Sequence, residues 1–428
     1  SVFPECVSEG KLDIDKLLSL CGEYIDNDFE KYKFEWKGKA ECLRLAQKRS
    51  TGTLRPCPEE SVDWDTTRNL YIEGDNLEVL KLLQTAYYRK VKMIYIDPPY
   101  NTGNDFVYAD DFADPMARYK EVTQQTTKSN PETMGRYHTN WLNMMYPRLR
   151  LAANLLRDDG VIFISIDDVE IDNLKKLCNE IFGEENFVAQ FIWQSRQNKD
   201  NRNITGVSID HEYVVCYTKQ FGHRVFRGTD RKTEQYKNPD NDPRGPWTSA
   251  NMVGLATADA RPNLHYDLIN PADGRNYGCP EKGWRYDRNT MNRLIQEGRI
   301  IWPDNPDGRP RKKSFLNELS DNLPGFSSIF STGVYTNTAT KEIGGLFNRY
   351  LFDFPKPVEI IKQLISQVSN TDDTILDFFS GSATTAHAVM QLNAEDGGNR
   401  RFILVQIPEL CDEKSEAYKA GYKNICEI

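Results

Sequence analysis

The sequence lacks the features that mark several common protein classes. Its 428 residues include no run of about 18 apolar residues, so no segment is expected to span a membrane. Nine cysteines and five histidines are scattered without a C-x-x-C pair or a metal-ligand spacing, which predicts inert thiols in a reducing compartment and no metal site. Neither G-x-G-x-x-G nor G-x-x-x-x-G-K-[ST] occurs, so neither a nicotinamide cofactor nor a nucleoside triphosphate is indicated.

The most informative motif that is present follows the apolar run 91–96. This run predicts a buried strand, and Asp97-Pro98-Pro99-Tyr100 comes directly after it. Ligands of open α/β sheets bind at the carboxyl ends of the strands, where this acid and this ring are expected to lie. The prolines fix φ and leave carbonyls free to accept hydrogen bonds. The pattern favours a rigid patch that grips an exocyclic amino group on a planar base, although prolines also punctuate ordinary turns.

A second motif lies about 280 residues later in the chain. The run 374–376 predicts a strand, Asp377 to Thr385 a turn of small residues, and the following segment a helix. Gly381 lies between two serines, Ser380 and Ser382, and lets the backbone approach a ligand closely. The helix start adds unpaired N–H groups. Alone, the motif is equally compatible with a plain strand–helix turn.

A third element begins with a short strand that ends in Gly74-Asp75-Asn76 and continues into an amphipathic helix. Asp75 and Asn76 can cap this helix, and a cap is compatible with a ligand contact. Together with Asp97 to Gly103 and Asp377 to Ser382, this element resembles amino-specific DNA methyltransferases. Because the catalytic motif precedes the S-adenosylmethionine (SAM) motif, the closest resemblance is to the β class, and within it to the modification (Mod) subunit of type III restriction–modification systems.

The resemblance implies a role for each motif. Asp97 and the Pro98 carbonyl would accept hydrogen bonds from an adenine N6 amino group, and Tyr100 would stack on the extruded base. On the cofactor side, Asp377 would line the methionine end of SAM, and Glu409 would accept from its ribose hydroxyls. In full, the expected catalytic residues are Asp97, Pro98, Pro99 and Tyr100, and the expected cofactor-binding residues are Asp75, Asn76, Lys356, Asp377, Phe379, Ser380, Gly381, Ser382 and Glu409. Within this set Asp75 is assigned to the adenine end of SAM and Lys356 to its amino-acid end.

Strands alternate with helical stretches, which predicts an α/β fold with a doubly wound, mostly parallel sheet of the Rossmann-like, circularly permuted methyltransferase type. Two further strands, 186–193 and 212–217, are expected to form an antiparallel edge. The predicted domains are a helical arm (1–60), a catalytic half (61–220), a target-recognition domain in the irregular region 221–345, and a SAM-binding half (346–428).

The overall net charge of −9 argues against a nonspecific nucleic-acid coat, since phosphate contacts supply most nonspecific affinity. Between residues 193 and 313, however, 21 basic residues outnumber 15 acidic ones, an excess of 6 that favours a local DNA-binding face. Arginine and asparagine are usual base readers, and this region offers many. The candidates are Arg196, Asn198, Arg202, Arg227, Arg231 and Arg261.

Three functions remain open from the sequence. The first is an adenine-N6 DNA methyltransferase that acts on double-stranded DNA, either as the Mod subunit of a type III system or as a stand-alone relative. It is expected to be a cytoplasmic, nucleoid-associated homodimer, and cleavage would need a separate Res-type nuclease/helicase subunit. The second is a cytosine-N4 methyltransferase, because cytosine also carries an exocyclic amine. The third is a DNA-recognition subunit that positions a nuclease, with methylation secondary. The intact Asp97, Tyr100 and Gly381 favour an active methyltransferase.

Overall fold

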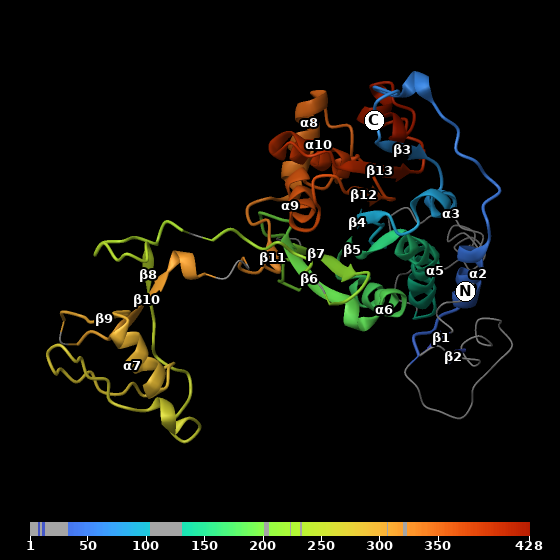
Figure 1. Cartoon of the computed structure of the whole chain (residues 1–428). Helices are drawn as coiled ribbons and strands as arrows, with labels where there is room; N and C mark the ends of the chain where they lie inside the picture. Colours follow the sequence, from blue (N-terminus) through green and yellow to red (C-terminus); the bar gives the residue numbers. More distant parts are fainter. Residues whose placement is uncertain are drawn as a thin grey trace. The chain divides into compact units, whose positions relative to one another are not determined.

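The computed structural model describes residues 33–102, 131–200, 205–222, 224–231, 233–305, 307–319 and 323–428, together with the short strands β1 (Val7–Ser8) and β2 (Lys11–Leu12). The chain divides into two compact units (Figure 1). The sheet unit comprises Ser1–Arg227 and Phe326–Ile428, and the insert unit comprises Gly228–Gly325.

An eight-stranded sheet forms the centre of the sheet unit (Figure 1). Its strand order is β11-β6-β7-β5-β4-β12-β13-β3, and all neighbours are parallel except the two pairs that β7 makes with β5 and β6. The predicted mostly parallel sheet and its antiparallel strands are therefore confirmed, and β11 adds an unpredicted parallel strand beyond β6. The strands are β3 (Leu70–Glu73), β4 (Val91–Ile96), β5 (Leu156–Ile166), β6 (Phe187–Gln194), β7 (His211–Thr218), β11 (Ile329–Phe330), β12 (Thr374–Asp377) and β13 (Arg401–Gln406).

Helices cover both faces of this sheet. Because side chains alternate along a strand, Ile94 and Ile96 of β4 join one apolar core, while Met93 and Tyr95 join the other. The first core includes residues of α2 (Lys39–Gln47), α3 (Asn76–Tyr87), α5 (Pro131–Leu155) and α6 (Ile171–Phe182), and the second includes residues of α9 (Val358–Val368) and α10 (Thr384–Asp396). Every residue of β4 is buried, as expected for a strand in the middle of a three-layer fold.

The permuted chain order appears directly in the strand order. β12 and β13 come from the C-terminal part of the chain, yet they lie between β4 and β3. β12 pairs in parallel with β4, through Ile375 with Met93 and Leu376 with Ile94. The carboxyl ends of β4 and β12 are therefore adjacent, although the two strands are nearly 280 residues apart in sequence.

The boundaries of the irregular region differ from the sequence-based expectation of 221–345. Val225 and Phe226 pack on the second apolar core of the sheet unit, so the insert unit begins later than expected. It also ends earlier, because β11 joins the main sheet and α8 (Thr336–Phe347) follows in the same unit. In the expected helical arm 1–60, the described residues form the antiparallel pair β1–β2, the helix α2 and a short 3-10 turn, Pro58–Glu60, so the segment is not purely helical. Residues 1–6, 9–10 and 13–32 lie outside the described part.

The insert unit has its own small core and sheet. Strand β10 (Arg311–Phe315) pairs antiparallel with β8 (Trp247–Ala250) and β9 (Ile300–Ile301), and α7 (Arg288–Gln296) contributes Met291 to the core. Asp287 caps α7, since its side chain accepts a hydrogen bond from the Thr290 N–H. Elsewhere in the sheet unit, α11 (Glu416–Lys419) follows β13. Among the described residues, every helix is too short or too polar to cross a lipid bilayer.

Candidate active site

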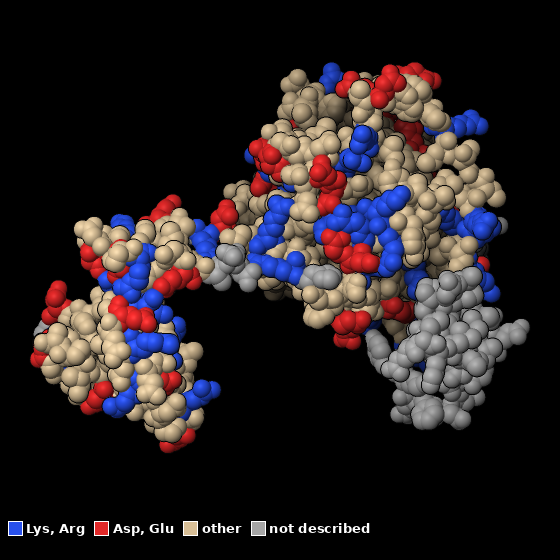
Figure 2. Space-filling model, in the orientation of Figure 1, with Lys and Arg blue, Asp and Glu red and all other residues tan. Residues whose placement is uncertain are grey.

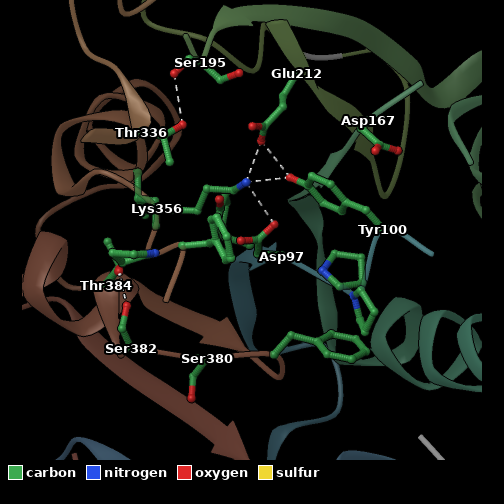
Figure 3. A pocket seen from close by; sticks show the side chains of 18 of the residues that line it. Asp97, Tyr100, Asp167, Ser195, Glu212, Thr336, Lys356, Ser380, Ser382 and Thr384 are labelled. Atoms are coloured by element: carbon green, nitrogen blue, oxygen red, sulfur yellow. Dashed lines mark hydrogen bonds and ion pairs between the residues drawn. The ribbon is translucent and has the colours of Figure 1, made fainter. Parts of the chain in front are cut away.

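A cavity of about 820 Å³ lies at the carboxyl edge of the sheet (Figure 3). Asp97 enters it directly after β4, and Asp377 enters it at the end of β12. Their strands are parallel neighbours, which is why the two motifs reach the same edge. Of the predicted site residues, those that line the cavity are Asp97, Pro98, Pro99, Tyr100, Lys356, Asp377, Phe379, Ser380, Gly381, Ser382 and Glu409.

The two prolines after Asp97 have different hydrogen-bonding states. The Pro99 carbonyl accepts a hydrogen bond from the Trp141 indole N–H at 2.7 Å, so it is not free for a ligand. This corrects the expectation that both proline carbonyls stay available. No described residue donates to the Pro98 carbonyl. The motif therefore offers the Asp97 carboxylate and one backbone carbonyl as acceptors.

Lys356 joins Asp97 and Tyr100 in one charged cluster (Figure 3). Its ammonium lies 2.6 Å from the Tyr100 hydroxyl, 2.6 Å from Glu212 Oε2 and 3.4 Å from Asp97 Oδ1. The Tyr100 hydroxyl in turn donates to Glu212 at 3.0 Å. The ammonium also lies 4.7 Å from the centre of the Tyr100 ring. The structure thus brings Lys356 to the catalytic motif, whereas the sequence had assigned it to the cofactor.

Burial and charge oppose one another in this cluster. Burial raises the pKa of Asp97, and the Lys356 ammonium limits that rise. Burial also works against ionisation of Glu212, but Lys356 lowers the pKa of this carboxyl overall. For Lys356, burial disfavours the ammonium, yet Asp97 and Glu212 together raise its pKa. Lys356 and Glu212 therefore form a charged pair beside Asp97.

The loop after β12 is held by the Asp377 carboxylate. One oxygen accepts from the Phe379 N–H at 3.0 Å, and the other accepts from the Thr385 hydroxyl at 2.6 Å. Burial raises the pKa of Asp377 to about 7. Gly381 has a φ of +50° and donates its N–H to the Gln406 side chain at 2.7 Å. Asp377 and Gln406 therefore fix the shape of the loop from its two sides.

The same loop offers one buried hydroxyl without a partner among the described residues. The Ser380 hydroxyl is buried and has no hydrogen-bond partner among the described residues, whereas the Ser382 hydroxyl bonds that of Thr384. A buried polar atom without a partner normally indicates a missing ligand or water. Glu409 lies just after β13 on the same cavity, and burial raises its pKa. An unpartnered hydroxyl, an open glycine loop and a carboxylate suit a ligand with ammonium, carboxylate and ribose hydroxyl groups, as SAM has.

Asp75 and Asn76 have structural partners instead. Asp75 caps α3 by accepting from the Glu78 N–H at 3.1 Å, and its other oxygen lies 3.3 Å from Arg148. Asn76 is fully buried; its amide donates to the Phe378 carbonyl at 2.7 Å and accepts from Arg148 at 2.5 Å. Neither residue lines the cavity. Through its hydrogen bond to the Phe378 carbonyl, Asn76 supports the backbone directly after Asp377. A cofactor contact by Asp75 or Asn76 stays a prediction.

Sequence reasoning assigned no role to several residues that build the site. Glu212 was visible in the segment His211-Glu212-Tyr213, but nothing local in the sequence shows its pairing with Lys356, 144 residues away. Glu170 is completely buried and accepts from Asn101 and His138, each at 2.6 Å. It thus holds the residue that follows Tyr100. The only sequence signal for Glu170 was its place shortly after the apolar run that forms the end of β5.

The candidate base readers differ in their surroundings. Arg227 donates to the Ser369 carbonyl at 2.5 Å, which anchors the end of the sheet unit. Arg196 pairs with Asp200 at 3.2 Å, and Arg261 and Asn198 are exposed. Arg202 lies outside the described residues, and Arg231 already has an interaction partner within the protein. Arg227 therefore has a structural role, while base reading by the others stays a prediction.

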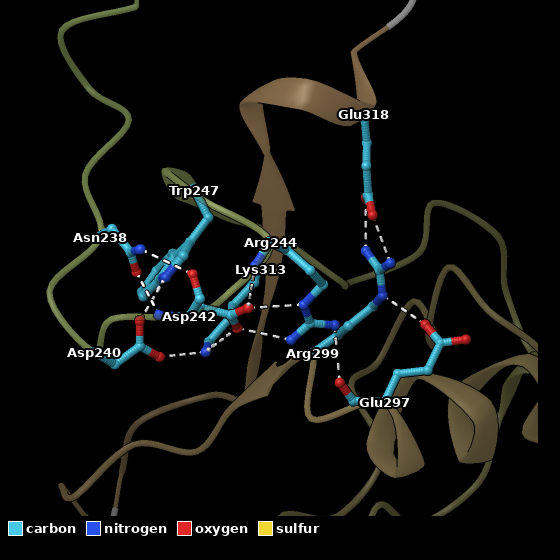
Figure 4. Close-up of polar contacts among 9 residues, drawn as sticks. All are labelled: Asn238, Asp240, Asp242, Arg244, Trp247, Glu297, Arg299, Lys313 and Glu318. Atoms are coloured by element: carbon cyan, nitrogen blue, oxygen red, sulfur yellow. Dashed lines mark hydrogen bonds and ion pairs between the residues drawn. The ribbon is translucent and has the colours of Figure 1, made fainter.

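In the insert unit, Arg244, Arg299 and Lys313 are paired with acidic neighbours (Figure 4). Asp242 binds Arg244 at 2.7 Å and Lys313 at 3.0 Å, and Arg299 binds Glu318 through two contacts of 2.6 Å. Figure 2 shows Lys and Arg interspersed with Asp and Glu over the visible face of this unit. Arg244, Arg299 and Lys313 are therefore engaged within the insert unit rather than free to meet phosphates.

Comparison with known proteins identifies the family. A profile for DNA methylases matches residues 91–420. The chain belongs to this DNA methylase family. It is 32% identical to the EcoP15I Mod subunit of a type III restriction-modification enzyme from Escherichia coli, over all of this chain and 72% of that one. It is 34% identical to the StyLTI Mod subunit from Salmonella typhimurium, over 99% of this chain and 66% of that one.

These DNA methylase relatives are longer than this chain, which spans 66% and 72% of their lengths. Among solved structures, the M1.HpyAVI–SAM complex is 16% identical, with a TM-score of 0.34 over 82% of this chain and 98% of that one. Family membership makes the chain a DNA methyltransferase with SAM as its cofactor, and the cavity at the carboxyl edge of the sheet fits that cofactor.

Proposed function

We propose that this chain methylates the N6 amino group of adenine in double-stranded DNA, as the modification subunit of a type III restriction–modification enzyme. The observation that carries the proposal is the pair of acceptors at the end of β4, the Asp97 carboxylate and the Pro98 carbonyl, beside the Tyr100 ring. An exocyclic amino group has two N–H donors, and these two acceptors match them. The Mod subunits among the relatives support the same assignment.

The acceptors address the weakness of adenine N6 as a nucleophile. Its lone pair is delocalised into the ring, so hydrogen bonds from both of its N–H groups to Asp97 and Pro98 favour a more pyramidal nitrogen with a localised lone pair. SAM, when bound, supplies an electrophilic methyl group. Holding the two reactants in line is the larger contribution, because positioning a bimolecular pair lowers a barrier by about 7–11 kcal/mol. The rigid Asp97–Tyr100 segment provides that positioning on the side of the base.

The cavity requires the base to leave the helix. Adenine N6 cannot reach Asp97 from inside a duplex, so the target base is flipped out at a cost of a few kcal/mol. Stacking on Tyr100 offsets part of this cost, since an aromatic–base stack contributes about 1–3 kcal/mol. The hydrogen bond from the Tyr100 hydroxyl to Glu212 holds the ring in place before the base arrives.

The loop after β12 serves the cofactor side. When SAM is bound, Asp377, Phe379 and the 380–382 turn would line its methionine end, and Glu409 would accept hydrogen bonds from its ribose hydroxyls; all of these residues line the cavity. The unpartnered Ser380 hydroxyl is available to donate to a carboxylate of the ligand. Gly381 leaves room beside it, because a Cβ at this position would meet only the Phe352 ring, at 3.5 Å.

The partners follow from the same assignment. The insert unit (Gly228–Gly325) would recognise the target sequence, and the protein would act as a homodimer on bacterial DNA in the cytoplasm. Cleavage would require a separate Res-type subunit, as the type III Mod relatives suggest. Size exclusion with light scattering, with and without duplex DNA, measures whether two copies assemble.

The test is to incubate the purified protein with SAM and unmethylated plasmid and to read the DNA by single-molecule sequencing. N6-methyladenine at one recurring sequence is the expected result, and Asp97→Ala is expected to abolish it while SAM binding persists. N4-methylcytosine would instead identify the cytosine enzyme. An unmodified plasmid, with SAM binding shown by calorimetry, would refute methylation by this chain and favour a recognition subunit.

A further inference from the structure

Three charged groups surround the place where the amino group is expected to bind. Asp97 and Glu212 are carboxylates, and Lys356 lies between them with contacts of 3.4 and 2.6 Å (Figure 3). Two negative charges and one positive charge leave the cluster with a net charge of −1. The ammonium is much closer to Glu212 than to Asp97, and its side chain is only 13% exposed. Its positive charge is therefore balanced mainly by Glu212.

This balance matters because of where charge appears during the proposed reaction. The attacking nitrogen becomes positive as it gains a methyl group, so a negative carboxylate beside it stabilises the transition state. A lysine paired with Asp97 alone would cancel that negative charge. Glu212 prevents this, since it holds the ammonium at 2.6 Å and shares it with the Tyr100 hydroxyl.

We propose that Glu212 and Lys356 are positioning residues that keep Asp97 negatively charged and Tyr100 fixed, so that the cluster presents one net negative charge to the target amino group. This inference rests on the proposed function and deepens it. Lys356 supplies the positive charge that keeps Asp97 ionised despite burial, and Glu212 keeps that lysine from neutralising Asp97. Neither residue needs to touch the reacting atoms.

The surroundings of Asp97 support this division of roles. The titratable groups that act on it are Lys356, Glu212 and Tyr100, together with Tyr95 of β4 and Asp377 of β12. The Tyr95 hydroxyl bonds that of Ser165 at 2.8 Å, and Asp377 is held by its own loop. Lys356 is the one cation among these groups, so Asp97 depends on it for a favourable charge.

The charge argument gives an unusual expectation for a double variant. Glu212→Gln keeps an oxygen that accepts from Tyr100 and Lys356 but removes the negative charge, which brings the cluster to zero. Lys356→Met keeps the length of the side chain but brings the cluster to −2. At a pH high enough to ionise Asp97 without Lys356, the double variant returns the charge to −1. A cluster that acted only as structural support would instead lose more function with each substitution.

The experiment measures single-turnover methyl transfer to plasmid DNA for wild type, both single variants and the double variant, with thermal unfolding of each. The rates are compared on the pH plateau above the acid limb of each protein, where Asp97 is ionised. Glu212→Gln is expected to slow transfer by about tenfold or more, and the double variant to recover to within about threefold of wild type. KM for DNA is expected to change little in either case. A double variant as slow as Glu212→Gln, or slower, would overturn the proposal.

A second measurement covers the case in which Glu212→Gln does not fold. In Lys356→Met the two carboxylates repel each other without a shared cation, so the pKa of Asp97 rises further. Because the reaction needs ionised Asp97, the acid limb of the pH–rate profile is expected to move to higher pH. An unchanged acid limb would overturn the proposal. Wild-type protein that binds SAM but methylates nothing would instead overturn the proposed function, so the two failures are distinguishable.

Discussion

Asn76 gives the sharpest test of how this site is built, because the sequence assigned it to the cofactor and the structure gives it structural partners. Asn76→Ala removes one acceptor from Arg148, at 2.5 Å, and one donor from the Phe378 carbonyl, at 2.7 Å. Asn76 and Arg148 are completely buried, so water cannot replace these bonds without a rearrangement. A buried group left without its partner costs about 1–3 kcal/mol, so the two groups together cost about 2–6 kcal/mol.

The assay compares wild type with Asn76→Ala by urea unfolding, which is monitored by circular dichroism. SAM affinity is measured by calorimetry at urea concentrations well below the unfolding midpoint. Asn76→Ala is expected to lower the free energy of unfolding by the amount given above, and SAM affinity is expected to fall by less than about tenfold. Asn399→Ala is the matched control, since Asn399 is exposed in the same unit and should change stability by no more than about 0.5 kcal/mol. Wild-type stability combined with a large loss of SAM affinity would show that Asn76 is a ligand residue after all.

Three further predictions follow from the same structure. Gly381→Val is expected to weaken SAM binding at least about tenfold in calorimetry. A β-branched residue is strained at a φ of +50°, and its side chain would enter the cavity. Unchanged SAM affinity would contradict the assignment of the loop to the cofactor. Asp377 has a folded-state pKa of about 7, above its ordinary value of 3.8, so its contribution to stability is complete at low pH and is lost as pH rises through 7. The free energy of unfolding of wild type minus that of Asp377→Asn should therefore be lower at pH 8 than at pH 5. A difference that does not change with pH would refute the raised pKa. Replacing residues 228–325 with a short flexible linker is expected to leave SAM affinity intact and to abolish methylation at the recurring sequence, whereas retained sequence specificity in the plasmid assay would place recognition elsewhere.

Much of the fold was predictable because it depends on local patterns. The runs around 91–96, 374–376 and 401–407 are short, apolar and followed by turn residues, and each forms a parallel strand of the main sheet. The limits of the insert were less predictable. Phe326 and β11 belong to the sheet unit through long-range packing and pairing, which no local composition reveals.

The sequence by itself determined which groups stand at the ends of which strands. Asp97 must follow β4 and Asp377 must end β12, because strand periodicity and the proline and glycine turns fix these points locally. Only the tertiary structure decided what meets there. Lys356 lies 256 residues from Tyr100 and 144 from Glu212, yet one ammonium contacts both. Such a contact depends on how β4, β7 and the segment before α9 pack together, and packing is a property of the whole core rather than of any one motif.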